Sequence, residues 1–320
     1  GRLRRDGFGR AVVNAHHLAG RLQAEVTAWR DRHCPDLSLA FSVERPEILG
    51  TGGGLVAARP LLEGATAAVI NGDILCDFDL PALVEEHRRS GAAATLLLAE
   101  HPDVERFGAV VVDETGAVLD LASLASRRAG AAGGAGGEAV ERGVFAGVHL
   151  VEEDVFDFLP AGGVACIVRQ GYVPMMKAGL DVRAIIHRGT WNDLGTTERY
   201  LQTHADLLDR GFPAGGAAAL VDSAGLDYGL DAASVEYGDP AKVTVARGAV
   251  LRPPLALGAG CVVEPGATVG PHCVLGEGVR VGRGALLERV VAWPGVQIEA
   301  GAQIRDAVCF RDGGEDRVAR

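Results

Sequence analysis

The feature that most constrains the fold is a six-residue rhythm in the last quarter of the sequence. From Val245 to Leu287 an aliphatic residue recurs at every sixth position, and glycine often follows it. After a one-residue deletion the series continues with Ala292, Ile298, Ile304 and Phe310. Such a period is typical of a parallel β-helix, in which each six residues form one side of a triangular coil. Because each coil buries its apolar face only against the next, residues 243–320 are predicted to form a cooperative stack of about four coils.

A different pattern precedes the repeats. Residues 1–211 alternate short apolar runs with helix-like segments, which favours an α/β sheet domain. The last of these segments predicts a helix that begins after Thr196, with Leu201, Ala205 and Leu208 on one face. Residues 212–242 are rich in Gly, Ala and Asp and predict a linker, and residues 126–139 predict a flexible Gly/Ala-rich loop. The sequence therefore predicts an α/β domain, a linker and a β-helix.

Composition excludes several classes of partner. The chain is 48% hydrophobic and 23% charged, as expected of a globular protein, and its net charge of -11 opposes binding to nucleic acid or to an anionic membrane. The apolar runs are far shorter than the roughly 20 residues of a membrane helix, and no leader-like segment opens the sequence. We therefore expect a cytoplasmic protein that binds neither nucleic acid nor membrane. The six cysteines form no CxxC pair, so we expect core residues rather than a zinc site or disulfides.

The stretch VINGDIL contains the first candidate for chemistry. The apolar residues 67–70 predict a strand that is buried on both faces and runs directly into Asn71, Gly72 and Asp73. In open α/β sheets, ligands bind outside the carboxyl ends of such strands, which makes Asp73 a candidate site residue. Asn, Gly and Asp are also ordinary turn formers, so this stretch by itself leaves both interpretations open.

The run LGTGGG suggests a surface for a nucleotide. Consecutive glycines allow backbone groups to approach a planar base or a ribose without intervening side chains. A glycine-rich beginning of a helix is the alternative interpretation.

Several stretches together carry a resemblance to a known family. They are VVNAHHLA, ERPEILGTGGGL, VINGDIL, VFAGVHL and GTWNDLGTTERYL, and they occur in this order. With the hexapeptide repeats, they make the chain similar to the sugar nucleotidyltransferases, especially the bacterial branch similar to mannose-1-phosphate guanylyltransferases. The resemblance implies a Rossmann-like α/β nucleotidyltransferase domain followed by a left-handed parallel β-helix.

The resemblance also implies an activity and a set of site residues. Members transfer a nucleotidyl group from a nucleoside triphosphate to a sugar-1-phosphate and release pyrophosphate, and mannose-1-phosphate with GTP is the favoured pair here. Asp73 and Asp193 would be the catalytic carboxylates that hold Mg²⁺, which prefers one or two carboxylates plus phosphate oxygens and waters. By the same resemblance the nucleotide contacts would be Glu44, Gly50, Thr51, Gly52 and Gly53, and the sugar contacts Gly147 and Glu141.

One departure from the family concerns its Gly-rich signature loop. In the family this loop carries an Arg that binds the triphosphate and precedes the strand that matches RAVVNAHHL here. The 320 residues do not contain it. We therefore expect a nucleotidyltransferase domain that lacks its first strand and phosphate loop, and little transfer activity from these residues by themselves.

Two other functions stay open at this point. Many hexapeptide proteins are acyltransferases that use a histidine as base, and His272 is the histidine within the repeats. Alternatively, the chain is a non-catalytic subunit whose β-helix mediates assembly. In either case the exposed edges of the coils lead us to expect a homo-oligomer.

Overall fold

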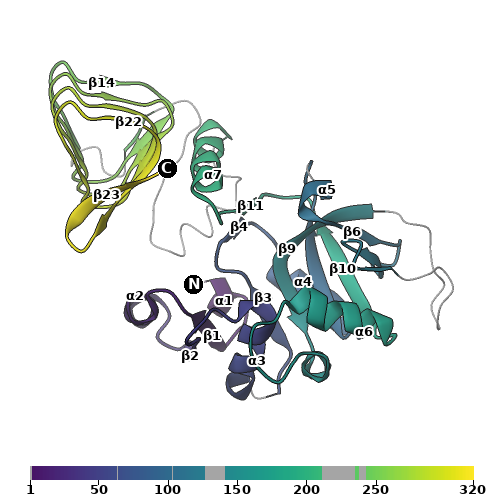
Figure 1. Ribbon diagram of the computed structural model, residues 1–320. Helices are drawn as coiled ribbons and strands as arrows, with labels where there is room; N and C mark the ends of the chain where they lie inside the picture. The colour runs from purple at the N-terminus through teal and green to yellow at the C-terminus, as the bar shows by residue number, and fades with distance from the viewer. Residues whose placement is uncertain (1, 63, 103, 127–140, 211–234, 238–242) are drawn as a thin grey trace. The chain divides into compact units, whose positions relative to one another are not determined.

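The computed structural model describes residues 2–62, 64–102, 104–126, 141–210, 235–237 and 243–320 (Figure 1). By their internal contacts these residues form two units, one of Gly1–Gly72 with Phe78–Gly189 and one of Asp73–Asp77 with Thr190–Arg320. The loop expected at 126–139 lies almost wholly outside the described residues, and so does most of the linker expected at 212–242. The domain boundaries expected from the sequence therefore stay predictions.

The first unit is built on a mixed sheet. Its described strands, in spatial order, are β10 (Val182–His187), β5 (Ala94–Ala99), β9 (Glu141–Val151), β6 (Ala109–Val112), β7 (Val118–Leu121) and β8 (Ala125–Ser126), with β3 (Ala67–Ile70) also beside β9. β10 runs parallel to β5, whereas the other pairs are antiparallel. Fully buried aliphatic residues such as Leu96, Leu98 and Leu121 form the centre of its core.

Helices and a second, smaller sheet complete this unit. The small sheet consists of β1 (Arg10–Ala15) and β2 (Ser38–Val43), which are parallel and joined through α2 (Ala19–His33). The other helices are α1 (Arg2–Arg5), α3 (Gly50–Leu62), α4 (Leu80–Ser90), α5 (Val104–Phe107), a 3-10 helix (Glu153–Asp157), and a π-helical segment (Ile167–Tyr172) that continues into α6 (Val173–Lys177). Asp79 caps α4, since its Oδ1 accepts a hydrogen bond from the backbone N–H of Ala82 (3.0 Å).

The prediction that β3 is buried on both faces is wrong. β3 pairs in antiparallel register with β9, and it has no second neighbour among the described strands. Ile70 at its carboxyl end is 37% exposed. An edge position, rather than a central one in a parallel sheet, explains this exposure. The segment that leads to Asp73 therefore leaves the sheet from an open edge.

The second unit contains the β-helix, whose coils are drawn in green and yellow in Figure 1. One side consists of β13 (Thr244–Val245), β16 (Val262–Val263), β19 (Arg280–Val281) and β21 (Gln297–Ile298). A second side consists of β14 (Val250–Leu251), β17 (Thr268–Val269) and the first halves of β20 (Leu286–Ala292) and β22 (Gln303–Asp312). The third consists of β12 (Val235–Tyr237), β15 (Leu255–Leu257), β18 (Cys273–Leu275) and the second halves of β20 and β22, and β23 (Glu315–Ala319) lies antiparallel to β22.

Stacking in the β-helix follows the predicted rhythm. Val263, Val281 and Leu287 point into the coil and are fully buried. All contacts between successive coils are parallel. This arrangement is consistent with the left-handed β-helix that the hexapeptide pattern implies.

The last inward position of the repeat differs from the prediction. Cys309, not Phe310, lies against Ala292 and is buried inside the coil. The reason is a second one-residue deletion at the corner formed by Asp306, which adopts a left-handed conformation (φ 48°) as Arg289 does one coil earlier (φ 52°). Phe310 consequently packs with the apolar cluster on the outside of the β-helix.

Helix α7 (Thr197–Arg210) covers one outer side of the β-helix. Leu201 and Leu208 pack against a column of outward-facing residues from four successive coils, Ala256, Val274, Val291 and Val308. Leu201, Ala205 and Leu208 are all buried, which confirms the predicted apolar face. This packing explains why α7 belongs by its contacts to the same unit as the repeats.

Five of the six cysteines behave as core residues, as expected, whereas Cys166 is exposed, contrary to the expectation. All six are free, and five of them are buried. Burial raises the pKa of the Cys261, Cys273 and Cys309 thiols to about 11, so these side chains are neutral at physiological pH. The expectation that the chain has no disulfide framework is confirmed.

Candidate functional site

A short antiparallel ladder brings Asp73 and Asp193 together. β4 (Ile74–Cys76) pairs with β11 (Trp191–Asp193), and Asp193 lies opposite Ile74. Just beyond the ladder, the backbone N–H of Leu194 donates to the backbone carbonyl of Asp73 (2.8 Å). Two residues that are remote in sequence are therefore held at the same end of one ladder.

Their carboxylates face a common space beside Gly195. A Cβ atom added to Gly195 would lie 2.9 Å from Asp193 Oδ1 and 3.7 Å from Asp73 Oδ2. Any side chain at position 195 would therefore fill the space that the two carboxylates share. Asp73 is exposed and Asp193 is half-buried, so the space is open to a small ligand from solvent. Two carboxylates that face one open space fit a hard divalent cation such as Mg²⁺.

Arg199 is a further member of this group that sequence reasoning missed. Its guanidinium donates to Asp193 Oδ2, while Asp193 Oδ1 accepts the backbone N–H of Gly195 (2.8 Å). Arg199 lies in the first turn of α7, where its backbone N–H donates to the cap residue Thr196 (3.2 Å). The available signal was its position, because a residue in the first turn after an N-cap lies close to the segment that precedes the helix.

The LGTGGG run opens helix α3. Gly50 adopts a left-handed conformation (φ 68°), and the backbone N–H groups of Gly52 and Gly53 both donate to the carbonyl of Ala165 (2.9 and 3.2 Å). A Cβ atom on Gly53 would lie 2.2 Å from the carbonyl oxygen of Gly163. Close packing against residues 163–165 is therefore one reason why these positions are glycine. Thr51 beside them is half-buried, and the nucleotide contacts expected of this run stay a prediction.

Glu44 is buried and connects β1 to the loop that precedes α3. Its Oε1 accepts from Asn14 Nδ2 (3.0 Å) on β1, and its Oε2 accepts from the backbone N–H of Leu49 (2.7 Å) just before α3. Both carboxylate oxygens are thus engaged by the protein. The arrangement fixes the loop that leads into the glycine run, and direct contact between Glu44 and a nucleotide stays a prediction.

The two residues expected near a sugar lie on the long strand β9. Gly147 has a positive φ of 75°, and its carbonyl accepts the backbone N–H of Asn71 (2.8 Å). A Cβ atom on Gly147 would lie 2.7 Å from Asn71 Nδ2, so glycine is needed for this close approach. Glu141 lies at the start of β9 and pairs with Arg188 (2.7 Å). A sugar contact by either residue stays a prediction.

Polar bonds fix α7 on the corner of the β-helix. Arg289 donates to Glu198 (2.8 Å) and Gln202 (3.2 Å) of α7 and to Asp306 of the next coil (2.8 Å). One coil earlier, His272 Nε2 lies 2.8 Å from Asp209 Oδ1, near the other end of the helix. The histidine considered as an acyltransferase base therefore has a helix carboxylate as its partner.

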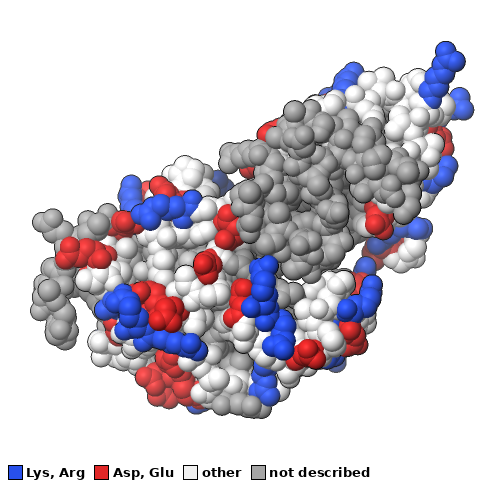
Figure 2. Space-filling view, turned by 180° about the vertical axis from the view of Figure 1, so that it is seen from behind, with Lys and Arg blue, Asp and Glu red and all other residues white. Residues whose placement is uncertain are grey.

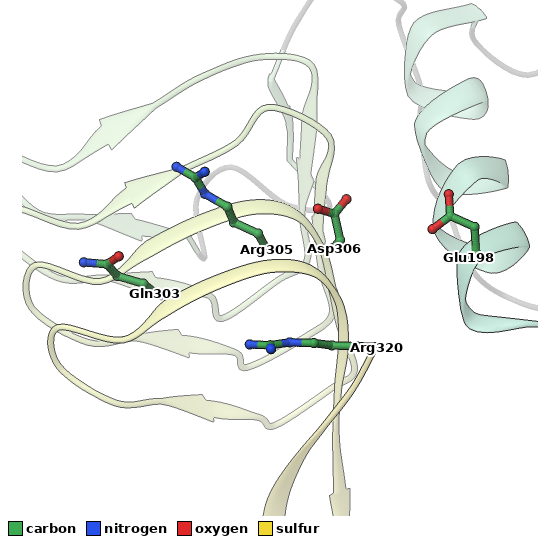
Figure 3. Close-up of a pocket in the computed structure, with 5 residues that line it drawn as sticks. All are labelled: Glu198, Gln303, Arg305, Asp306 and Arg320. Carbon is green, nitrogen blue, oxygen red and sulfur yellow. The ribbon is translucent and has the colours of Figure 1, made fainter.

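A hollow of about 640 Å³ lies on the second unit, between the start of α7 and the coils (Figure 3). It is lined by Glu198, Gln303, Arg305, Asp306 and Arg320. Figure 3 shows Arg305 extending away from α7, whereas Asp306 lies on the side that faces Glu198. Charged residues outside the lining already engage two of these side chains, since Asp306 accepts from Arg289 and Arg305 pairs with Glu288 (3.3 Å). We assign no ligand to this hollow.

Comparison with known protein families supports the motif-based resemblance. Residues 2–210 match the family described as "Nucleotidyl transferase", and residues 240–312 match "GlmU-like, C-terminal hexapeptide". The first match covers more than half of the chain. The two matches correspond to the α/β and hexapeptide parts expected from the sequence.

Individual relatives are sugar-phosphate nucleotidyltransferases. The chain is 28% identical to a UTP–glucose-1-phosphate uridylyltransferase of Synechocystis sp. over 65% of this chain and 54% of that protein. It is 30% identical to a mannose-1-phosphate guanylyltransferase of Mycobacterium tuberculosis over 50% and 42%, respectively. It is also 30% identical to an N-acetylmuramate alpha-1-phosphate uridylyltransferase of Neisseria meningitidis serogroup B over 64% and 80%. The chain spans about half the length of the first two relatives.

Proposed function

We propose, because the chain belongs to the nucleotidyl transferase family, that it joins a nucleoside triphosphate to a sugar-1-phosphate and releases pyrophosphate. The observation that carries the proposal is the convergence of the Asp73 and Asp193 carboxylates on the space beside Gly195. The names of the relatives from Synechocystis, Mycobacterium tuberculosis and Neisseria support a sugar phosphate as acceptor.

Asp73 and Asp193 are the proposed ligands of Mg²⁺. Bound there, the cation would neutralise charge on the α-phosphate while an oxygen of the sugar-1-phosphate attacks in line. The chain's own contribution is to fix the two carboxylates before substrate arrives. The β4–β11 ladder and the bond from Leu194 to Asp73 provide this, because they hold both backbones in one register.

Further substrate contacts are proposed for the first unit. Glu44 with Gly50, Thr51, Gly52 and Gly53 would contribute to nucleotide binding, and Gly147 with Glu141 to sugar binding. For Glu44 we propose an indirect role, because both of its oxygens already bind Asn14 and Leu49. It would orient the glycine run rather than contact the base.

Mannose-1-phosphate with GTP is our favoured substrate pair. The Mycobacterium tuberculosis relative is named a mannose-1-phosphate guanylyltransferase. The order of an α/β domain followed by hexapeptide repeats agrees with this assignment. Glucose-1-phosphate with UTP or dTTP is the alternative, and the Synechocystis relative favours the UTP form.

The test is pyrophosphate release with a matrix of nucleoside triphosphates and sugar-1-phosphates, in Mg²⁺ and in EDTA. It is run on the 320-residue chain and on the same chain extended by a family-type strand and glycine-rich loop. We expect little release from the 320-residue chain by itself, and Mg²⁺-dependent release from the extended chain with at least one pair, highest for GTP with mannose-1-phosphate. Failure of both proteins with every pair would contradict the proposal and favour a non-catalytic subunit.

Acyl transfer is the weaker candidate. The imidazole of His272 is held by Asp209 of α7, and this bond gives His272 a part in fixing the helix. We expect no acetyl transfer from acetyl-CoA to amino sugars by the chain, and a rate that His272→Gln abolishes would reverse this assignment.

We also propose that the chain self-associates through its β-helix. Large hydrophobic side chains on its surface include Val250 (46% exposed), Trp293 (45%) and Val318 (51%). Sedimentation velocity of the whole chain should show a concentration-dependent oligomer, and a monomer at all concentrations would contradict this. A deletion of the repeats would be a poor test, because it would also expose the apolar face of α7.

The other expected properties concern nucleic acid and membranes. On the face shown in Figure 2, Lys and Arg side chains alternate with Asp and Glu over the described residues. None of the helices in the described ranges combines the length and the apolarity that crossing a membrane requires. A cytoplasmic location stays a prediction.

A further inference from the structure

The chain itself engages both carboxylate oxygens of Asp193. One carboxylate oxygen accepts the backbone N–H of Gly195 (2.8 Å), and the other accepts from Arg199. Both side chains are partly buried, with 28% of Asp193 and 36% of Arg199 exposed. Since solvent screens such a pair incompletely, its charges are substantially neutralised by each other.

This pairing opposes a cation at the same carboxylate. A guanidinium on Asp193 Oδ2 repels a divalent ion that approaches the shared space beside Gly195, because two positive charges would lie within a few ångströms of each other. The bond from Gly195 N–H raises no such obstacle. A carboxylate has about four acceptor positions, so Oδ1 can keep this bond and still bind a cation.

The pairing also has a function when no cation is present. Asp73 and Asp193 direct their oxygens at one space, and two carboxylates that share a site repel each other when both are ionised. A positive charge on Asp193 relieves this repulsion. It also keeps the carboxylate in the orientation that the shared space requires.

Release of the pair must occur through the Arg199 side chain. The surrounding turn of α7 is fixed on both sides, because Arg289 binds Glu198 and Gln202, and Leu201 is buried in the cluster outside the β-helix. A shift of the helix would break all these contacts. Rotation of the partly exposed Arg199 side chain breaks only its own bonds.

We propose that Arg199 is a placeholder for the divalent cation: it neutralises and orients Asp193 in the metal-free protein and leaves the carboxylate when the cation binds. This inference rests on the proposed metal role of Asp73 and Asp193. It adds a positioning residue that competes with the cation, so that loss of Arg199 strengthens metal binding instead of weakening it.

The test is the dissociation constant of Mn²⁺, measured without nucleotide on the full chain by calorimetry and by electron paramagnetic resonance. We expect Arg199→Gln to bind Mn²⁺ about tenfold more tightly than the wild type, since a competing charge-assisted pair is lost. Arg199→Lys keeps the positive charge and should stay within about threefold of the wild type. Arg280→Gln is the matched control, because it removes one positive charge from an exposed pair on β19 and should leave the affinity unchanged.

Thermal unfolding provides a second readout. Metal-free Arg199→Gln should unfold at a lower temperature than the wild type, and saturating Mn²⁺ should raise its midpoint more than that of the wild type. A merely structural role for Arg199 predicts lower stability with unchanged or weaker metal binding.

The outcomes separate this inference from the proposed function. If Mn²⁺ binding is lost in Asp193→Asn but is equal or weaker in Arg199→Gln, the placeholder role is overturned and the metal pair stands. If Asp73→Asn and Asp193→Asn bind Mn²⁺ like the wild type, or no variant binds it, the metal pair fails and the placeholder role fails with it.

Discussion

Asp73 and Asp193, remote from each other in the sequence, each place a carboxylate oxygen within 4 Å of one point beside the α-carbon of Gly195. Asp73 lies directly before the short strand β4, Asp193 ends the short strand β11, and the pairing of these two strands sets their relative position. The two carboxylates therefore depend on a short stretch of backbone and on the missing side chain at position 195. The site can therefore be tested by a substitution at Gly195 that leaves both aspartates in place.

Replacement of Gly195 by alanine should block the shared space. The new Cβ would lie 2.9 Å from Asp193 Oδ1, closer than ordinary packing allows. We expect the Mn²⁺ dissociation constant to rise by about tenfold or more, because one carboxylate must turn away from the cation. Gly162→Ala is the control, since a Cβ there meets no atom within 4 Å. Unchanged Mn²⁺ affinity in Gly195→Ala would show that the cation, if bound, lies elsewhere.

Removal of the Arg289 guanidinium should loosen α7 from the β-helix. Arg289→Met keeps much of the side-chain volume but loses the bonds to Glu198, Gln202 and Asp306. We expect a loss of about 1–2 kcal/mol in the free energy of unfolding, as for partly buried charge-assisted hydrogen bonds. The free energy of unfolding is measured by urea titration monitored by circular dichroism.

Arg305→Met provides the comparison for this prediction. Arg305 pairs with Glu288 at 3.3 Å, and its side chain is 64% exposed. We expect a change close to zero, because exposed ion pairs contribute little to stability. Equal effects of the two substitutions would show that the corner at Arg289 does not fix the helix.

His149 should make the stability of the first unit sensitive to acid. Burial lowers the pKa of this imidazole to about 3, and its Nδ1 bonds with the hydroxyl of Tyr172 (2.8 Å). Between about pH 6.5 and pH 3 the unfolded chain binds a proton here that the folded chain does not. The free energy of unfolding therefore falls as the pH falls, by up to about 1.4 kcal/mol per pH unit from this group.

His149→Phe should remove this contribution and keep the ring that stacks on Phe145. Relative to the wild type, we expect the variant to gain about 2 kcal/mol in unfolding free energy between pH 7 and pH 5. Any constant cost of leaving the Tyr172 hydroxyl without its partner is the same at both pH values. A parallel pH profile for wild type and His149→Phe would contradict the prediction.

The β-helix was the most predictable part of the fold. A six-residue period depends only on which side chains point inward, so the sequence alone locates Val263, Val281 and Leu287 in the core. The error at Phe310 arose at a corner, where the left-handed conformation of Asp306 shortens the path by one residue. The outward-facing column that includes Val274 and Val291, and its packing against α7, were not predicted.

The candidate site was predictable where it follows from a strand end or from the family resemblance, and it was missed where it depends on packing. VINGDIL places Asp73 after an apolar strand, Asp193 in WNDLG was predicted from the resemblance, and the structure brings the two aspartates together. The position of Arg199 in the first turn of α7 indicates that it lies near this segment, but its pairing with Asp193 also depends on the direction in which α7 leaves the ladder. Likewise, Gly53 is required by the approach of Gly163, a tertiary contact that no local pattern reports.

Asp73→Asn and Asp193→Asn provide the most direct test of the central claim, that these two carboxylates hold the catalytic cation. Each change keeps the side-chain size and removes a charge that Mg²⁺ requires. The measurement is the Mg²⁺-dependent rate of pyrophosphate release, compared with the nucleotide dissociation constant, on the 320-residue chain or, where its turnover is too slow, on the chain extended by the glycine-rich loop. The account predicts that kcat falls at least about 100-fold in each variant while the nucleotide dissociation constant changes by less than about threefold, because the cation acts chiefly on charge that develops during transfer. A double variant with normal Mg²⁺-dependent turnover would contradict it.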